Sequence, residues 1–160
     1  MRYKKNQFDI QDIYTLKNKS FISMTTNETR NFGKHFAKVL KKGDVVLFYG
    51  DLGSGKTTFI QGILNAFGYK GFANSASFII INEYDMLKNN IRVVHIDLYR
   101  LPSTQICYLE LEEYLYGNNI ALIEWPDKSI AHYGNWIIRI HHDFSNIQGL
   151  NSRTLHIEKI

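Results

Sequence analysis

Gly50-Asp51-Leu52-Gly53-Ser54-Gly55-Lys56-Thr57 is the stretch of sequence that decides the fold of this chain. It matches G-x-x-x-x-G-K-[ST], the phosphate-binding loop of nucleoside triphosphatases. Glycines at positions 53 and 55 let the backbone turn so that successive N–H groups converge on phosphate oxygens. Lys56 offers a positive charge to the β- and γ-phosphates, and the Thr57 hydroxyl can bind Mg²⁺. The motif therefore predicts that the chain binds a nucleoside triphosphate.

The residues on both sides of the loop support this prediction. Val45–Tyr49, directly before it, is a β-branched and aromatic run typical of a buried strand. After the loop, apolar residues recur at helical spacing until Gly68. A strand, a glycine loop and a helix in this order place the helix N-terminus against the phosphates. This context disfavours the alternative, a glycine-rich turn without a ligand.

Composition limits the class of protein. The 160 residues are 44% hydrophobic and 21% charged, as expected for one globular domain. No apolar run is long enough to span a bilayer, and no apolar signal core follows the basic N-terminus. The single cysteine, Cys107, cannot form an internal disulfide and fits a reducing compartment. We therefore expect a cytoplasmic protein that does not bind membranes.

Positive charge is concentrated near the start of the chain, although the net charge is only +4. Such a concentration is compatible with a patch for nucleic acid or an acidic partner, although lysines in this pattern are more often a solvated helix face. The sequence alone leaves both interpretations open. The lysines concerned are Lys4, Lys5, Lys17, Lys19, Lys34, Lys38, Lys41 and Lys42.

The pattern of the whole chain predicts an α/β fold. We expect a three-layer P-loop NTPase-like domain over residues 20–160, with a central mixed, mostly parallel sheet, after an N-terminal extension of uncertain order at 1–19. Besides the strand, loop and helix already described, the predicted elements are a strand at 21–24, a helix from a capping box at Thr25 and Glu28 to Leu40, a hairpin of strands at 78–81 and 92–96, a helix at 103–116, a strand at 120–123, and a C-terminal pair of strands around 136–140 and 155–157.

Two acids each end a predicted hydrophobic strand, Asp97 after Val93–Ile96 and Glu124 after Ala121–Ile123. Phosphate-loop enzymes use a carboxylate at such a position to hold Mg²⁺. A solvated acid at a strand end is the alternative for each, but an intact phosphate loop in the same chain favours function. We assign the metal to Asp97 and the orientation of the attacking water to Glu124.

Several other sites are weaker or excluded. Ser75 and Ser77 could sense the γ-phosphate, as switch loops do, although the residues alone favour a plain loop. The six histidines show no spacing typical of a metal site. The chain also lacks the N-K-x-D motif of guanine readers, which disfavours a signalling-type GTPase.

Four blocks of sequence occur in an order that resembles the TsaE (YjeE) family of small bacterial ATPases. They are the phosphate loop, Ser75-Ala76-Ser77-Phe78, the block His95-Ile96-Asp97-Leu98-Tyr99-Arg100-Leu101, and Leu122-Ile123-Glu124-Trp125-Pro126. The resemblance covers about residues 21–160, and the last two blocks are more specific than the phosphate loop. Ala76-Ser77 stands where the family usually has Pro-Thr, so the loop loses a stiffening proline but keeps a hydroxyl.

The resemblance implies a role in forming threonylcarbamoyladenosine next to the anticodon of ANN-decoding tRNAs. It implies ATP and Mg²⁺ as cofactors, TsaD and TsaB proteins as partners, tRNA reached through that complex, and ATP hydrolysis that is slow alone and stimulated by the partners. Lys56 and Glu124 would be catalytic, and Thr57, Asp97 and Glu124 would hold the metal. The implied nucleotide-binding residues are Thr29, Asp51, Leu52, Gly53, Ser54, Gly55, Lys56, Thr57, Thr58 and Ser77.

Two alternatives come from other functional classes. A small-molecule kinase would need an acceptor pocket and usually a lid with several arginines, yet only Arg92, Arg100, Arg139 and Arg153 follow Tyr69. A non-catalytic interaction module that responds to nucleotide is the second alternative, and the two strand-end acids argue against it.

Overall fold

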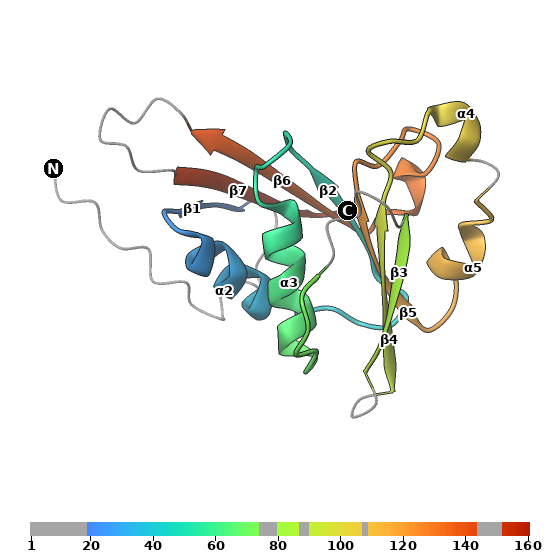
Figure 1. Cartoon of the computed structure of the whole chain (residues 1–160), viewed down its shortest axis with the longest axis horizontal. Helices are drawn as coiled ribbons and strands as arrows, with labels where there is room; N and C mark the ends of the chain where they lie inside the picture. Colours follow the sequence, from blue (N-terminus) through green and yellow to red (C-terminus); the bar gives the residue numbers. More distant parts are fainter. Residues whose placement is uncertain (1–18, 74–79, 87–89, 107–108, 144–151) are drawn as a thin grey trace, which may run out of the picture.

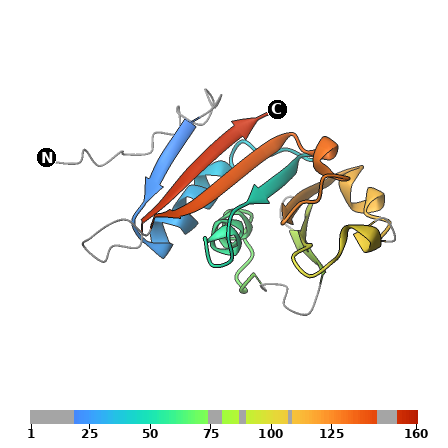
Figure 2. The same cartoon turned by 90° about the horizontal axis from the view of Figure 1, so that it is seen from above.

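The computed structural model of this chain contains a seven-stranded sheet with helices on both faces (Figures 1 and 2). The structure describes residues 19–73, 80–86, 90–106, 109–143 and 152–160. The predicted extension at 1–19 therefore lies outside the described residues, apart from Lys19. The strands are β1 (Lys19–Ser23), β2 (Val45–Tyr49), β3 (Ile81–Met86), β4 (Ile91–Asp97), β5 (Asn119–Glu124), β6 (Trp136–Asp143) and β7 (Ser152–Lys159).

The sheet is mixed, as predicted, with the strand order β1-β7-β6-β2-β5-β4-β3. Strand β2 lies near the centre and pairs in parallel with β5 and β6, and β4 pairs in parallel with β5. The pairs β1–β7, β6–β7 and β3–β4 are antiparallel. Among the described strands, parallel pairs thus equal antiparallel pairs in number, because both edges of the sheet are built from antiparallel partners. The expectation of a mostly parallel sheet holds only for its centre.

The helices before and after β2 begin where the sequence predicts, although the first ends at Phe36 and not at the predicted Leu40. Helix α2 (Thr26–Phe36) starts at the predicted capping box, in which the Glu28 N–H donates to Thr25 Oγ1 at 3.1 Å. The Glu28 carboxylate accepts in turn from the Met24 N–H at 2.7 Å. Helix α3 (Lys56–Ala66) follows the phosphate loop directly. None of the described helices is long and apolar enough to cross a lipid bilayer.

Helices α2 and α3 cover one face of the sheet and pack closely against each other (Figure 1). The contact requires glycine on both helices, because a Cβ at Gly33 would overlap the Phe59 carbonyl and a Cβ at Gly62 would overlap the Arg30 carbonyl. Aromatic rings fill the space below, and Phe59 lies 5.8 Å from the ring of Phe48 on β2. This packing fixes α3, and therefore the end of the phosphate loop, against the sheet.

The opposite face carries two short helices instead of the single helix predicted for residues 103–116. They are α4 (Ser103–Ile106) and α5 (Glu112–Leu115), and between them Glu110 has a φ of 46°. Ile106 and Leu115 both pack into the apolar cluster on this face. Nine residues apart, they would lie roughly 180° apart around one continuous helix. The prediction was wrong because a straight helix cannot bury both side chains on the same face.

The edge hairpin is confirmed, but its first strand runs later than predicted. Strand β3 covers Ile81–Met86 and pairs antiparallel with β4, whereas the sequence suggested 78–81. Residues 78 and 79 lie outside the described residues. On β3, Tyr84 and Met86 face the core, while Glu83 and Asp85 form ion pairs with Arg92 on β4 at the surface. An edge strand needs only this alternation and not a continuous apolar run.

Candidate nucleotide-binding site

The phosphate loop joins the carboxyl end of β2 to the amino end of α3, in the order that the sequence predicts. Gly55 precedes the helix with a φ of 108°, in the left-handed region that favours glycine. A Cβ at Gly50 would overlap the Ile140 carbonyl on β6. Glycine is therefore required at this position, where the loop passes close to the backbone of β6. The N-cap, Gly55, has no side chain to cap the helix, and this leaves the first N–H groups of α3 available to an anion.

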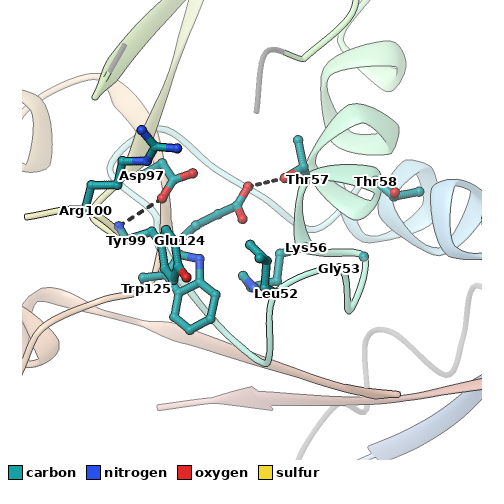
Figure 3. Close-up of a pocket in the computed structure, with 11 residues that line it drawn as sticks. Leu52, Gly53, Lys56, Thr57, Thr58, Asp97, Tyr99, Arg100, Glu124 and Trp125 are labelled. Atoms are coloured by element: carbon teal, nitrogen blue, oxygen red, sulfur yellow. Dashed lines mark hydrogen bonds between the residues drawn. The ribbon is translucent and has the colours of Figure 1, made fainter. Parts of the chain in front are cut away.

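A cavity of about 370 Å³ lies over this loop (Figure 3). Its volume is within the range of sites for small-molecule ligands. Loop and helix residues form one side, and the ends of β4 and β5 form the other. The lining residues are Leu52, Gly53, Gly55, Lys56, Thr57, Thr58, Asp97, Tyr99, Arg100, Glu124 and Trp125. Eight of the residues proposed from the sequence are therefore brought together here.

Strand periodicity explains why both acids reach the cavity. Alternate side chains point to opposite faces of a sheet, and Val93 on β4 and Leu122 on β5 face α3. His95, Asp97 and Glu124 continue these two series on the same face. Strands β4 and β5 are parallel, and Asp97 is the register partner of Glu124. Both carboxylates therefore end at the same edge of the sheet, beside the start of α3.

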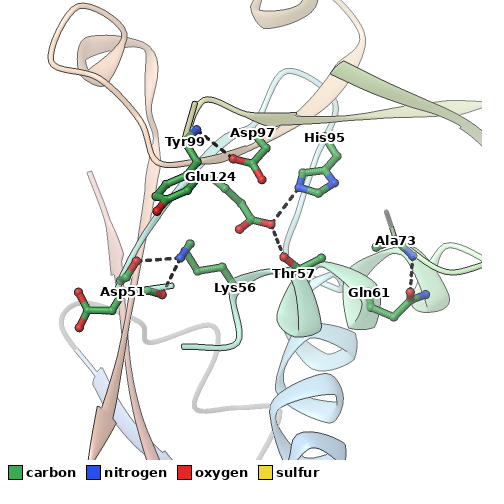
Figure 4. A network of polar contacts seen from close by, with 10 residues as sticks. Asp51, Lys56, Thr57, Gln61, Ala73, His95, Asp97, Tyr99 and Glu124 are labelled. Carbon is green, nitrogen blue, oxygen red and sulfur yellow. Dashed lines mark hydrogen bonds and ion pairs between the residues drawn. The ribbon is translucent and has the colours of Figure 1, made fainter. Parts of the chain in front are cut away.

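Glu124 is held by two hydrogen-bond partners. Thr57 Oγ1 donates to Glu124 Oε1 at 2.7 Å, and His95 Nε2 lies 3.0 Å from the same oxygen (Figure 4). Glu124 is 3% exposed and His95 is fully buried. Sequence reasoning did not select His95 for the site. The available signal was its position two residues before Asp97, which places it on the same face of the strand.

Asp97 has a more open environment than Glu124. It is partly exposed, and its Oδ1 accepts the Tyr99 N–H at 3.0 Å. Partial burial raises the pKa of this carboxyl, and the charge of Glu124 adds to the increase, whereas the Tyr99 N–H, His95 and Lys56 oppose it. Burying negative charge beside a second carboxylate is unfavourable, so a bound cation would be stabilised here.

The Lys56 side chain is buried between the phosphate loop and an aromatic ring. Its Nζ donates to the carbonyl oxygens of Gly50 at 2.7 Å and Asp51 at 3.0 Å. The same Nζ lies 4.0 Å from the centroid of Trp125, a cation–π contact. Burial lowers the pKa of Lys56, while Glu124, Asp97 and Asp51 act to raise it. Trp125, directly after Glu124, also lines the cavity, and its ring packs 4.7 Å from that of Tyr99.

Three predicted nucleotide-binding residues do not line the cavity, and Ser77 lies outside the described residues. Asp51 and Ser54 belong to the loop but are absent from the lining. Thr29 is fully buried behind the loop, where its hydroxyl lies 2.7 Å from Ser23 Oγ and donates to the Thr25 carbonyl. A residue that the sequence did not suggest, Arg153 on β7, donates through Nε to the Ser54 carbonyl at 3.1 Å and supports the loop from behind.

The oxygen donors of the cavity suit Mg²⁺. A threonine hydroxyl and two carboxylates are hard oxygen ligands, and Mg²⁺ commonly takes one or two protein carboxylates together with substrate phosphates. Within the described part of the chain, no group of three or more His, Cys, Asp or Glu side chains could hold a metal ion by itself. The donor set therefore fits a metal ion shared with a triphosphate.

Comparison with known proteins now adds to this geometry. The family model described as "Threonylcarbamoyl adenosine biosynthesis protein TsaE" matches residues 23–153. This chain belongs to the TsaE family. A Synechocystis protein named "tRNA threonylcarbamoyladenosine biosynthesis protein TsaE" is 37% identical over 106 residues, which are 64% of this chain and 66% of that protein. A Rickettsia prowazekii protein of the same name is 45% identical over 102 residues, 62% of this chain and 69% of that protein.

A solved structure of similar fold covers more of this chain than the two sequence relatives do. The crystal structure of Bacillus subtilis YdiB superposes with a TM-score of 0.71 at 28% sequence identity and covers 90% of this chain and 86% of YdiB. The matched segment spans just under two thirds of the Synechocystis TsaE. The TsaE resemblance inferred from the four sequence blocks and the predicted fold class are both confirmed.

Proposed function

We propose that this TsaE-family chain is a Mg²⁺-dependent ATPase that acts in forming threonylcarbamoyladenosine next to the anticodon of ANN-decoding tRNAs. It works in the cytoplasm with TsaD and TsaB proteins and reaches tRNA through their complex. The names of the relatives support the pathway. The observation that carries the ATPase assignment is the convergence of Lys56, Thr57, Asp97 and Glu124 on one cavity.

The phosphate loop and the start of α3 bind the phosphates in this proposal. N–H groups of the loop and of the uncapped helix end donate to phosphate oxygens. Lys56 exchanges its bonds to the Gly50 and Asp51 carbonyls for the β- and γ-phosphates. The exchange keeps the buried ammonium group fully hydrogen-bonded, which is required because an unpaired buried charge is costly.

The two carboxylates and the Thr57 hydroxyl perform the remaining functions. Thr57, Asp97 and Glu124 would hold Mg²⁺, which when bound neutralises charge on the phosphates. Glu124 also orients the attacking water, because its carboxylate lines the cavity and is fixed by hydrogen bonds. Hydrolysis by the isolated chain is slow, and binding to TsaD and TsaB accelerates it.

The test is reconstitution with TsaD, TsaB, threonylcarbamoyl-adenylate and tRNA, with and without this protein. We expect modified tRNA to accumulate over several turnovers, with phosphate released, only when the protein is present. Lys56→Ala should abolish the effect, whereas Lys70→Ala, at an exposed position after the C-terminal end of α3, should not. Phosphorylation of a small acceptor would indicate a kinase instead, and nucleotide binding without phosphate release would indicate a non-catalytic module.

A further inference from the structure

We propose that His95 is a positioning residue that holds the Glu124 carboxylate in its working orientation. The inference rests on the proposed function, because it takes Glu124 as the group that orients water. His95 reaches no lining position of the cavity itself. It acts on the reaction through Glu124, to which its Nε2 is hydrogen-bonded at 3.0 Å.

The position of His95 in the sheet makes this contact rigid. It is the third-last residue of β4, fully buried, and paired with Asn82 on β3 and Leu122 on β5. Pairing on both sides fixes the strand backbone, and complete burial leaves the imidazole little room to rotate. The imidazole therefore approaches Glu124 from a fixed direction, across the parallel β4–β5 pair.

The hydrogen bonds define which ring nitrogen carries the proton. An ionised Glu124 can only accept, so His95 Nε2 must donate to it. The other ring nitrogen, Nδ1, is buried, and the described residues offer it no hydrogen-bond partner. A proton on Nδ1 would leave that buried N–H without an acceptor and would set the bare Nε2 lone pair against the Glu124 carboxylate, so the Glu124 contact decides the tautomer. We assign the proton to Nε2.

Two donors on one oxygen fix the rotation of the carboxylate. Glu124 Oε1 accepts from Thr57 Oγ1 and interacts with His95 Nε2, while Figure 4 shows the second oxygen directed away from His95, on the side of Lys56. Thr57 is also a proposed metal ligand, so the direction of its O–H can change when a metal binds through the same oxygen. His95 has no such second task and supplies the permanent donor.

A pair of nearly isosteric variants separates positioning from packing. His95→Gln keeps an N–H donor at about the distance of Nε2 from the backbone, whereas His95→Met keeps the length and volume but removes the donor. We expect His95→Met to lower kcat for ATP hydrolysis about 10- to 100-fold, as is typical when a supporting hydrogen bond is lost, with KM for ATP unchanged. His95→Gln should recover most of kcat. Equal losses in both variants, or a loss confined to KM, would overturn the proposal.

A spectroscopic measurement decides the question independently of turnover. Nitrogen-15 NMR of the imidazole in the nucleotide-free protein should show His95 protonated at Nε2 and bare at Nδ1, with a shift of the Nε2 signal in Glu124→Gln. A proton on Nδ1 with Nε2 bare would refute the proposal even if ATP hydrolysis is confirmed. If the wild type hydrolyses no ATP, the proposed function fails, and the NMR result still tests the contact. Thermal unfolding of both His95 variants identifies any that fail to fold.

Discussion

Strands β4 and β5 end in acids that occupy equivalent places in the sheet but have different surroundings. Asp97 and Glu124 are register partners, and both line the cavity. Asp97 is partly exposed and accepts one backbone N–H, from Tyr99. Glu124 is 3% exposed, and one of its oxygens is shared by Thr57 and His95. Register places the two carboxylates together, but side-chain partners distinguish them.

The difference suggests a division of tasks. A carboxylate held by donors from two elements has a fixed orientation, which water activation requires. A partly exposed carboxylate whose pKa is raised by burial, and further by a neighbouring acid, is stabilised when a cation arrives. We therefore expect substitutions of Glu124 to affect the chemical step and substitutions of Asp97 to affect the binding of metal.

The largest expected effect is a loss of ATP hydrolysis in the Glu124→Gln variant. The amide keeps the shape of the side chain and an oxygen acceptor for Thr57 and His95, but removes the negative charge and the basic group. Loss of general-base catalysis typically costs 100-fold or more, so we expect kcat for partner-stimulated ATP hydrolysis to fall by about that factor. ATP affinity measured with a chelator present and association with TsaD and TsaB should remain. Phosphate release and calorimetry measure the two quantities.

Glu113→Gln is the matched control for this substitution, because Glu113 is an exposed glutamate on α5. It should hydrolyse ATP at the wild-type rate. Full stimulation of Glu124→Gln by the partners would leave Asp97 as the acid that matters and would remove the proposed division of tasks.

Much of this arrangement was predictable from local sequence patterns. The run Val45–Tyr49, the glycine loop and the apolar spacing after it specify a strand, a turn and a helix without distant contacts. The capping box at Thr25 and Glu28 acts within one helical turn, so its prediction was also confirmed. Each of these features depends on residues close together in the chain.

The remainder depends on contacts between distant residues, which one sequence does not reveal. Nothing near Ser54 indicates that Arg153, 99 positions later, donates to its carbonyl. Similarly, the burial of His95 against Glu124 requires the parallel β4–β5 register. The helix predicted for residues 103–116 was wrong because its apolar residues satisfy a tertiary cluster and not a helical face.

A smaller effect, weaker binding of Mg²⁺-ATP, is expected in the Asp97→Asn variant. Asparagine keeps an oxygen for the Tyr99 N–H but provides a weaker, uncharged ligand. Weakening a metal-site interaction typically costs about 10- to 100-fold in metal affinity, so the affinity for Mg²⁺-ATP should fall by about tenfold. The affinity for ATP in the presence of a chelator should not change. Calorimetry with and without Mg²⁺ tests this, and an equal loss in both conditions would contradict the metal assignment.

Asp97→Asn should also change how stability depends on pH. Because the folded-state pKa of Asp97 is raised, the folded protein binds this proton more tightly than the unfolded chain does, and that stabilisation is lost as the pH rises through the raised pKa. The nucleotide-free variant should therefore be more stable than the wild type at pH 7, with the difference vanishing at acid pH. Since Asp97 is partly exposed and solvent screens its charge, the difference at pH 7 should be small.

Asp127→Asn should change the pH dependence of stability in the opposite direction, because the pKa of Asp127 is lowered and not raised. Hydrogen bonds from the Ser129 N–H and the Ser103 hydroxyl lower the pKa of partly exposed Asp127 to about 2. Its contribution to stability is present at neutral pH and is lost as the pH falls towards that value. Chemical denaturation across the pH range should show the Asp127 variant less stable than the wild type at pH 7 and equal to it in strong acid. If the stability of both variants, relative to the wild type, changed with pH in the same direction, the assigned directions of the two pKa shifts would be wrong.

The smallest expected effect is optical and concerns the aromatic residues that follow the two acids. Trp125 succeeds Glu124, Tyr99 lies two residues after Asp97, and their rings pack 4.7 Å apart at the cavity. Lys56 Nζ lies 4.0 Å from the Trp125 ring, so its transfer to phosphate oxygens would change the charge next to the indole. Trp136 is instead packed in the core, 5.1 Å from the ring of Phe36. Adding Mg²⁺-ATP should change fluorescence in the wild type and in Trp136→Phe, and much less in Trp125→Phe. A response carried wholly by Trp136 would mean that Lys56 does not leave Trp125 when nucleotide binds.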